Sequence, residues 1–155
     1  MKNNDILRRL RYTFDLSDSK MMELFKLGGY PATRAEISDW LKKEDDPNHK
    51  SLYDKMLATV LNGMIIHERG KKDGEELKAE KSLNNNIIFR KIKIALKLTS
   101  DEIVEIFELV DVRISKHEVT SFFRKPGSRQ YRICHDQYLR NFIYGLQVAY
   151  KEEED

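Results

Sequence analysis

Residues 134–136 read Cys-His-Asp, three side chains whose types suit nucleophilic chemistry. A thiolate that is activated by an imidazole and oriented by a carboxylate is a known catalytic arrangement. On a helix, however, consecutive residues are rotated by about 100° and do not face one another, which is poor geometry for a triad. We therefore expect no catalytic residue and interpret the protein as a non-enzymatic binding or regulatory module.

Four histidines and one cysteine are the side chains best suited to bind a metal ion. They show neither the two-residue spacing nor the paired helical ligands of zinc sites. The sequence also lacks the glycine-rich fingerprints that bind nucleotides. We expect no metal ion and no cofactor. The residues concerned are His49, His67, His117, His135 and Cys134.

The most basic segment is residues 124–132, RKPGSRQYR, which we call the basic loop. It has no acid, and such a surface is typical of anion binding, while an interleaved tyrosine can stack on a base. The alternative is a solvated loop whose arginines pair with glutamates. The candidate binding residues are Arg124, Lys125, Arg129, Tyr131 and Arg132, and the candidate partners in the alternative are Glu102, Glu105 and Glu108.

An internal duplication defines the elements that must position this loop. Residues 98–125 are a diverged copy of residues 16–43, at a constant offset of 82 residues. The same offset pairs Asn-Asn at 3–4 with Asn-Asn at 85–86, and Gly63 with Gly145. We name residues 1–69 unit one and residues 85–150 unit two.

The counterpart of the basic loop is residues 42–50, KKEDDPNHK, which we call the unit-one loop. Its acids Glu44, Asp45 and Asp46 cancel the local charge, so the repeated fold does not require a basic loop. The counterpart of Cys134 is Leu52, which indicates an apolar core position rather than a reactive thiol.

Helical periodicity predicts four helices in each unit and no strand. The first covers residues 4–15 and its copy, and the fourth covers residues 52–68 and 134–150. The second starts after Ser17 or Thr99 and ends at residues 28–29 or near Asp111. The third follows Thr33 or Ser115, each of which begins a Ser/Thr-x-x-Glu capping box.

Two pairs of repeated residues lie in the fourth helices. Glycine inside a helix costs about 1 kcal/mol relative to alanine, so we expect close packing at Gly63 and Gly145, with the two fourth helices as the candidate pair. The repeated aspartates at 54 and 136 are expected to stabilise the helix start or pair with the arginines at 8 and 90, rather than to catalyse a reaction.

The remaining segments and the composition set the organisation. Residues 70–84 are polar and predict a solvated linker or short exposed helix, and residues 151–155 form an acidic tail. The net charge of +2 is too small to indicate nucleic acid by itself. No apolar run approaches the roughly 20 residues that span a bilayer. The segment MKNNDILRRLRY lacks the apolar region typical of a signal peptide, and the single cysteine cannot form an internal disulfide, so we expect no secretion. We expect a cytoplasmic protein that does not bind membranes.

The second and third helices of each unit have the outline of a DNA-binding helix-turn-helix. In unit two the outward side of the third helix should show Lys116, Thr120, Ser121 and Arg124, which can contact phosphates or bases. The turn at residues 28–32 is longer than the usual length of about three or four residues, and an ordinary solvated helix has the same pattern.

The repeated pattern resembles the YehS-like family of bacterial proteins of unknown function, a duplicated helical domain. The resemblance spans nearly the whole chain and implies a cytosolic bacterial protein, with no activity to carry over. It rests on the leucine, Ser/Thr cap and acidic helix, on the Ser/Thr-x-x-Glu box, and on Arg124-Lys125-Pro126-Gly127, Tyr131-Arg132, Asp136, Leu139 and Gly145.

We therefore expect an all-α protein of two tandem four-helix repeat units. Nucleic acid is the first expected partner, bound through the third helix and basic loop of unit two, and the alternative is a protein–protein interaction adaptor. The expected binding residues are Lys116, Thr120, Arg124, Lys125, Arg129, Tyr131 and Arg132.

Overall fold

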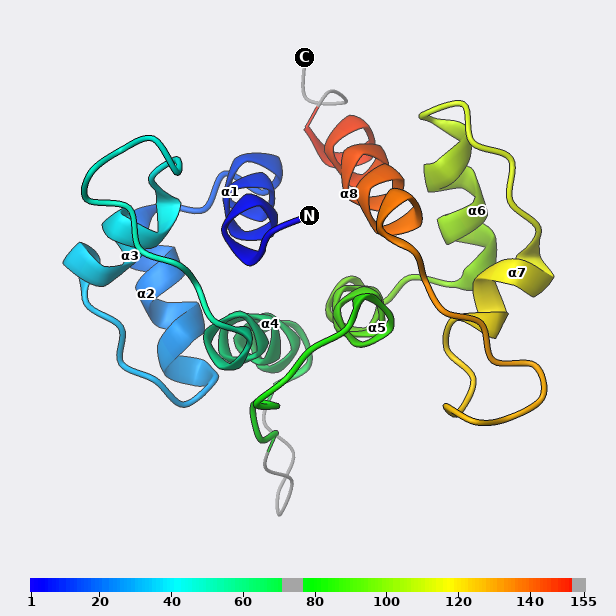
Figure 1. Cartoon of the computed structure of the whole chain (residues 1–155), viewed down its shortest axis with the longest axis horizontal. Coiled ribbons are helices and arrows are strands. Elements are labelled where there is room, and N and C mark those ends of the chain that lie inside the picture. The colour runs from blue at the N-terminus through cyan, green and yellow to red at the C-terminus, as the bar shows by residue number, and fades with distance from the viewer. Residues whose placement is uncertain (71–76, 152–155) are drawn as a thin grey trace. The chain divides into compact units, whose positions relative to one another are not determined.

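The computed structural model describes residues 1–70 and 77–151 (Figure 1). Within these ranges the chain forms eight α-helices and no β-strand. The all-α expectation is therefore confirmed. Among the helices described, none is both long and apolar enough to cross a membrane.

Internal contacts divide the chain into Met1–Leu83 and Asn84–Asp155, and the same four helices recur in each part. Unit one contains α1 (Asn3–Thr13), α2 (Asp18–Leu27), α3 (Arg34–Leu41) and α4 (Asp54–Arg69). Unit two contains α5 (Asn85–Leu96), α6 (Ser100–Glu108), α7 (Lys116–Ser121) and α8 (Asp136–Tyr150). The matching order supports the tandem duplication.

The predicted caps start the second and third helices of both units. The hydroxyls of Ser17, Thr33, Thr99 and Ser115 each accept a hydrogen bond from the backbone amide three residues later, at 3.0–3.2 Å. Each such cap contributes about 1 kcal/mol to helix stability. The helix starts are therefore encoded locally.

Several predicted helix boundaries shift in the structure. The first helix, α1, ends at Thr13 rather than Asp15, and α6 ends at Glu108 rather than near Asp111. The helix α7 ends at Ser121, so Phe122 and Phe123 lie in the following turn. Both fourth helices begin at an aspartate, two residues later than predicted, at Asp54 and Asp136. Residues 77–84 are not helical, which leaves the linker reading for the described part of that segment, while residues 71–76 and 152–155 lie outside the described residues.

The cores of the two units use different side chains at equivalent positions. In unit two, Phe89 stacks on Phe142 with ring centroids 4.2 Å apart. Their counterparts in unit one are Leu7 and Val60, both buried. Aromatic rings therefore fill in unit two the volume that aliphatic side chains fill in unit one.

Gly63 and Gly145 permit close helix packing, as expected. A Cβ at Gly63 would overlap the carbonyl oxygen of Leu24 in α2, and one at Gly145 would lie 2.5 Å from the carbonyl oxygen of Ile106 in α6. The expected pairing of the two fourth helices at these glycines is wrong, because each fourth helix meets the second helix of its own unit there.

Candidate functional site

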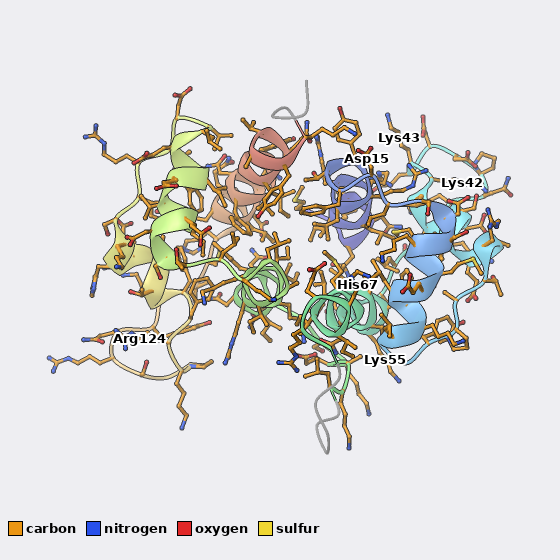
Figure 2. The ribbon with its side chains drawn as sticks, turned by 180° about the vertical axis from the view of Figure 1, so that it is seen from behind. Asp15, Lys42, Lys43, Lys55, His67 and Arg124 are labelled. Atoms are coloured by element: carbon orange, nitrogen blue, oxygen red, sulfur yellow. The ribbon has the colours of Figure 1, made fainter. Side chains whose placement is uncertain are left out.

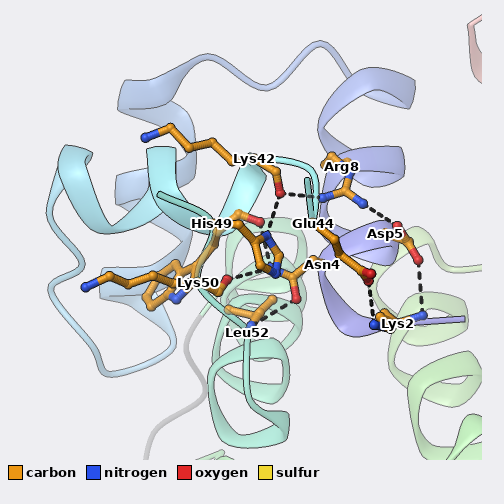
Figure 3. A network of polar contacts seen from close by, with 10 residues as sticks. Lys2, Asn4, Asp5, Arg8, Lys42, Glu44, His49, Lys50 and Leu52 are labelled. Atoms are coloured by element: carbon orange, nitrogen blue, oxygen red, sulfur yellow. Dashed lines mark hydrogen bonds and ion pairs between the residues drawn. The ribbon is translucent and has the colours of Figure 1, made fainter. Parts of the chain in front are cut away.

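A buried asparagine in α1 holds both ends of the unit-one loop (Figure 3). The Nδ2 of Asn4 donates to the carbonyl oxygens of Trp40 and Lys50, both at 2.8 Å. Its Oδ1 accepts from the backbone amide of Leu52 at 3.0 Å. One side chain thus joins the end of α3 to the segment before α4.

The same arrangement recurs in unit two and fixes the ends of the basic loop. The Nδ2 of Asn86 donates to the carbonyl oxygens of Phe122 at 3.0 Å and Arg132 at 2.8 Å. Its Oδ1 accepts from the amide of Cys134 at 2.9 Å. This clamp explains why the fourth helix starts after Cys134 rather than at it.

A second repeated asparagine binds the aspartate that begins each fourth helix. Asn3 donates to Asp54 and Asn85 donates to Asp136, each at 2.7 Å. The hydrogen bond from Asn85 is the main cause that lowers the pKa of Asp136 below its ordinary value. The expected pairing with arginine is wrong, since Arg8 pairs instead with Asp5.

The interior of the basic loop follows the same path as the unit-one loop. Three backbone hydrogen bonds recur at equivalent positions, all between 3.0 and 3.2 Å. They join Lys43 to Asp46, Asp46 to His49 and Asp39 to Lys50 in unit one, and Lys125 to Ser128, Ser128 to Tyr131 and Ser121 to Arg132 in unit two. The basic loop therefore has a defined backbone that does not depend on its charges.

One turn of the two loops differs in type. Gly127 has a φ of 86°, as the third position of a type II turn requires, and it follows Pro126. The residue at this place in unit one is Asp45, which is not among the residues of positive φ. Proline and glycine thus replace two acids without changing the path of the loop.

In unit one, acidic side chains pair with Lys42 of the loop and with Lys2 beside it. Lys42 pairs with Asp39 at 2.7 Å, and Glu44 pairs with Lys2 at 2.6 Å. The hydrogen bond between these two side chains is the main cause that raises the pKa of Lys42 and lowers the pKa of Asp39. The counterparts of Asp39 and Glu44 are Ser121 and Pro126, which carry no charge.

The basic side chains of unit two have no such partners. In the part of the chain that the structure describes, the side chains of Arg124, Lys125, Arg129 and Arg132 form neither an ion pair nor a hydrogen bond, and all four residues are exposed. The alternative pairing with Glu102, Glu105 and Glu108 is therefore wrong. Figure 2 labels Arg124 and its counterpart Lys42.

The expected binding residues of α7 are placed differently from one another. Lys116 is exposed and lies 3.4 Å from Asp101. Thr120 is half-buried, and its hydroxyl donates to the carbonyl oxygen of His117 at 2.9 Å. Ser121 is buried and donates to Glu118, so its expected outward position is wrong. Of these residues, only Lys116 is exposed, and its ammonium group pairs with the carboxylate of Asp101.

The connections between the second and third helices are residues 28–33 and 109–115. Both are longer than the turn of about three or four residues in a DNA-binding helix-turn-helix. The basic loop is thus the stronger candidate surface, with α7 as its neighbour.

Cys134 occupies a core position, like Leu52 in unit one. Its side chain is buried, and burial raises the pKa of the thiol to about 12. A thiol with so high a pKa is a poor nucleophile at neutral pH. Among the described residues, no three His, Cys, Asp or Glu side chains lie close enough together to hold a metal ion.

Sequence reasoning missed the residues that hold the loop and border it. The roles of Asn85 and Asn86 were visible only as a repeated dipeptide at the start of each first helix. His135 and Tyr138 stand next to Tyr131 and Arg132 in one surface groove, although the periodicity of α8 gave no sign of it. A repeated polar pair at a helix start was the one available signal.

Comparison with known proteins gives matches along both units. The family described as "Protein of unknown function (DUF1456)" matches residues 3–70 and 85–151. The Uncharacterized protein YehS of Escherichia coli (strain K12) is 37% identical over 147 residues, which cover 94% of each protein. No solved structure matches the chain. The two matched segments correspond to the two copies of the repeat.

Proposed function

The chain belongs to the family described as "Protein of unknown function (DUF1456)", and we propose that it is a nucleic-acid-binding module whose contact surface is the basic loop of unit two. The observation that carries this proposal is that the four loop cations have no ion pair among the described residues, on a backbone that unit one builds with equal numbers of lysines and acids. The repeated fold does not require these cations, which supports a role for them in binding a ligand.

The chemistry of the loop favours a polyanion. Lysine and arginine that neutralise phosphates release condensed counterions, which supplies most of the affinity for nucleic acid. The cationic surface continues beyond the loop, because Lys93 of α5 lies over the ring of Phe123, 5.3 Å from its centroid, and Arg124 follows Phe123. Arginine adds geometric fit, since its planar fork matches a phosphate.

A protein partner is the second candidate. Ile133 follows the basic loop and is 64% exposed, and Tyr53 in unit one is 76% exposed. Exposed apolar side chains beside charges are typical of protein interfaces. An adaptor function would depend on such contacts, and its affinity would be less sensitive to salt.

We also propose a cytoplasmic location, which cell fractionation tests.

Fluorescence anisotropy with labelled single-stranded and duplex RNA and DNA, at several salt concentrations, tests the proposal. Four phosphate contacts predict a log-log salt slope of about −3 on single strands and about −4 on duplex DNA. Replacing Arg124, Lys125, Arg129 and Arg132 with alanine should abolish binding and leave the unfolding midpoint unchanged.

The matched control replaces Lys42, Lys43 and Lys50 of the unit-one loop with alanine. This variant should keep most of the affinity, because the three acids of the same loop offset the charge of these lysines. No measurable binding of the wild-type protein to any nucleic acid at low salt would contradict the proposal and leave the protein adaptor.

A further inference from the structure

A groove of about 550 Å³ opens beside the basic loop in unit two. Its walls come from three segments, because Phe122 follows α7, Tyr131 belongs to the loop and Tyr138 lies in the first turn of α8. Tyr138 packs on Phe122 with ring centroids 5.3 Å apart. The volume lies within the range typical of small-ligand sites, about 300–1,000 Å³.

The polar groups on the groove walls are available to a ligand. Among the described residues, the hydroxyls of Tyr131 and Tyr138 and the ring of His135 form no hydrogen bond. Glu118 uses its Oε1 for the cap at Ser115, which leaves its other oxygen. Aromatic walls with hydrogen-bonding groups at their edges suit a flat heteroaromatic ligand.

The charges around the groove indicate which part of a nucleic acid would bind in it. Glu118 and Arg132 both line the groove, but Glu118 repels a phosphate, whereas Arg132 is part of the basic loop. Phosphates therefore belong on the loop and a base belongs in the groove. A duplex keeps its bases stacked and paired, so a single strand presents a base at much lower cost.

We propose that unit two binds single-stranded nucleic acid, with one unpaired base stacked on Tyr131 in this groove and the adjacent phosphates on the basic loop. This inference rests on the proposed function and adds the strand type and the position of a base. Stacking of a base on an aromatic side chain contributes a factor of about 5 to 150 in affinity and tolerates any sequence.

Unit one offers no equivalent set of available groups. The counterpart of Tyr131 is His49, whose Nδ1 bonds to the carbonyl oxygen of Lys42 at 2.8 Å. The counterpart of Glu118 is Glu36, whose carboxylate accepts from the hydroxyl of Tyr30 at 2.5 Å. These two positions of unit one are thus engaged internally, whereas Tyr53, the counterpart of His135, is exposed.

The test uses single strands of about 12 nucleotides, within the site sizes of such proteins, that carry a central 2-aminopurine. Wild-type protein should change the 2-aminopurine fluorescence and bind the single strand more tightly than a duplex of the same length. Tyr131→Leu should weaken single-strand binding at least about fivefold, abolish the fluorescence change and leave duplex affinity unchanged. Tyr131→Phe should behave as wild type.

Tyr53→Leu is the matched control, because Tyr53 is an exposed tyrosine before α4 in unit one, and it should alter none of these values. Wild-type affinity and an intact fluorescence change in Tyr131→Leu would overturn the groove assignment, as would equal affinity for duplex and single strand. If the fourfold alanine variant still loses binding in that case, the proposed function stands and only this inference fails. Absence of all nucleic-acid binding would remove the proposed function itself.

Discussion

The unit-one loop and the basic loop share three backbone hydrogen bonds but differ in charge, since the first has equal numbers of lysines and acids and the charged residues of the second are all basic. Both are held by an asparagine of the first helix, through Asn4 in unit one and Asn86 in unit two. Around the first loop Asp39 and Glu44 pair with lysines, and around the second the matching positions carry no acid. The fold therefore requires the asparagine hydrogen bonds in both units, whereas it does not require a particular charge on the loop.

The two units also differ where the second helix crosses the fourth. In unit one, α2 meets α4 through two glycines, because a Cβ at Gly28 would also overlap the backbone of Thr59. In unit two, Val110 replaces Gly28, and only Gly145 remains at the crossing. Unit one therefore depends on close backbone contact more than unit two does.

The largest expected effect comes from Gly63→Ala. Its added Cβ would overlap the backbone of Leu24, which cannot move aside like a flexible side chain, so the loss of stability should reach about 3 kcal/mol or more. Gly145→Ala should cost less, about 1–3 kcal/mol. Urea unfolding measures both. Ser38→Ala, on the exposed side of α3, is the control and should be neutral or slightly stabilising. A raised melting temperature in either glycine variant would refute the close packing.

The next effect should be equal in the two units. Asn4→Ala and Asn86→Ala each leave two carbonyl oxygens and one amide without their partner, and each should reduce the free energy of unfolding by about 2 kcal/mol. Asp in place of either asparagine keeps the acceptor and loses the donor, so it should be no better tolerated. A neutral alanine variant in one unit alone would show that the clamps are not equivalent.

Local signals made most of the helix order predictable from the sequence. Caps such as Thr33 and Ser115 and the apolar periodicity act within a few residues, and the duplication let each copy check the other. The asparagine hydrogen bonds were not predictable, because Asn4 contacts Trp40 and Lys50, which are distant in the sequence, and helical periodicity reports only on near neighbours.

The candidate site was predictable only in part. The charge of the basic loop is a property of the sequence, and so is its contrast with the unit-one loop. The burial of Ser121 and the groove formed with Tyr138 depend on how three segments meet, and small polar residues at a helix end do not reveal which way they face.

Exchanging the two loops would test whether charge and groove act separately. A variant with RKPGSRQYR at residues 42–50 and KKEDDPNHK at residues 124–132 should fold, because both sequences support the same backbone hydrogen bonds. It should bind duplex within about tenfold of wild type, a change of about 1.4 kcal/mol, but lose the preference for single strands, because Tyr138 and Phe122 stay in unit two. Anisotropy titrations measure both. A folded variant without any affinity would show that the loop charge is not sufficient.

The smallest expected effect concerns a pair that only unit one has. The hydroxyl of Tyr30 donates to Glu36 and is the main cause that lowers the pKa of Glu36, while the same bond raises the pKa of Tyr30. Unit two has Val112 in place of Tyr30. Tyr30→Phe should therefore raise the pKa of Glu36 toward its ordinary value, although the amide of Thr33 still lowers it.

The sign of the pH dependence follows from these directions. Because the pKa of Glu36 is lower in the folded state, its contribution to stability is present above the ordinary value of 4.5 and is lost as pH falls through the folded pKa. The raised pKa of Tyr30 adds a contribution that is present below 10.0 and is lost as pH rises through the folded pKa. Tyr30→Phe should thus be slightly less stable than wild type at neutral pH and match it in acid. A carboxyl-detected NMR titration reports the pKa of Glu36, with Tyr53→Phe as the control that should leave it unchanged. An unaltered titration of Glu36 in Tyr30→Phe would show that the hydrogen bond does not set its pKa, and would remove this difference between the units.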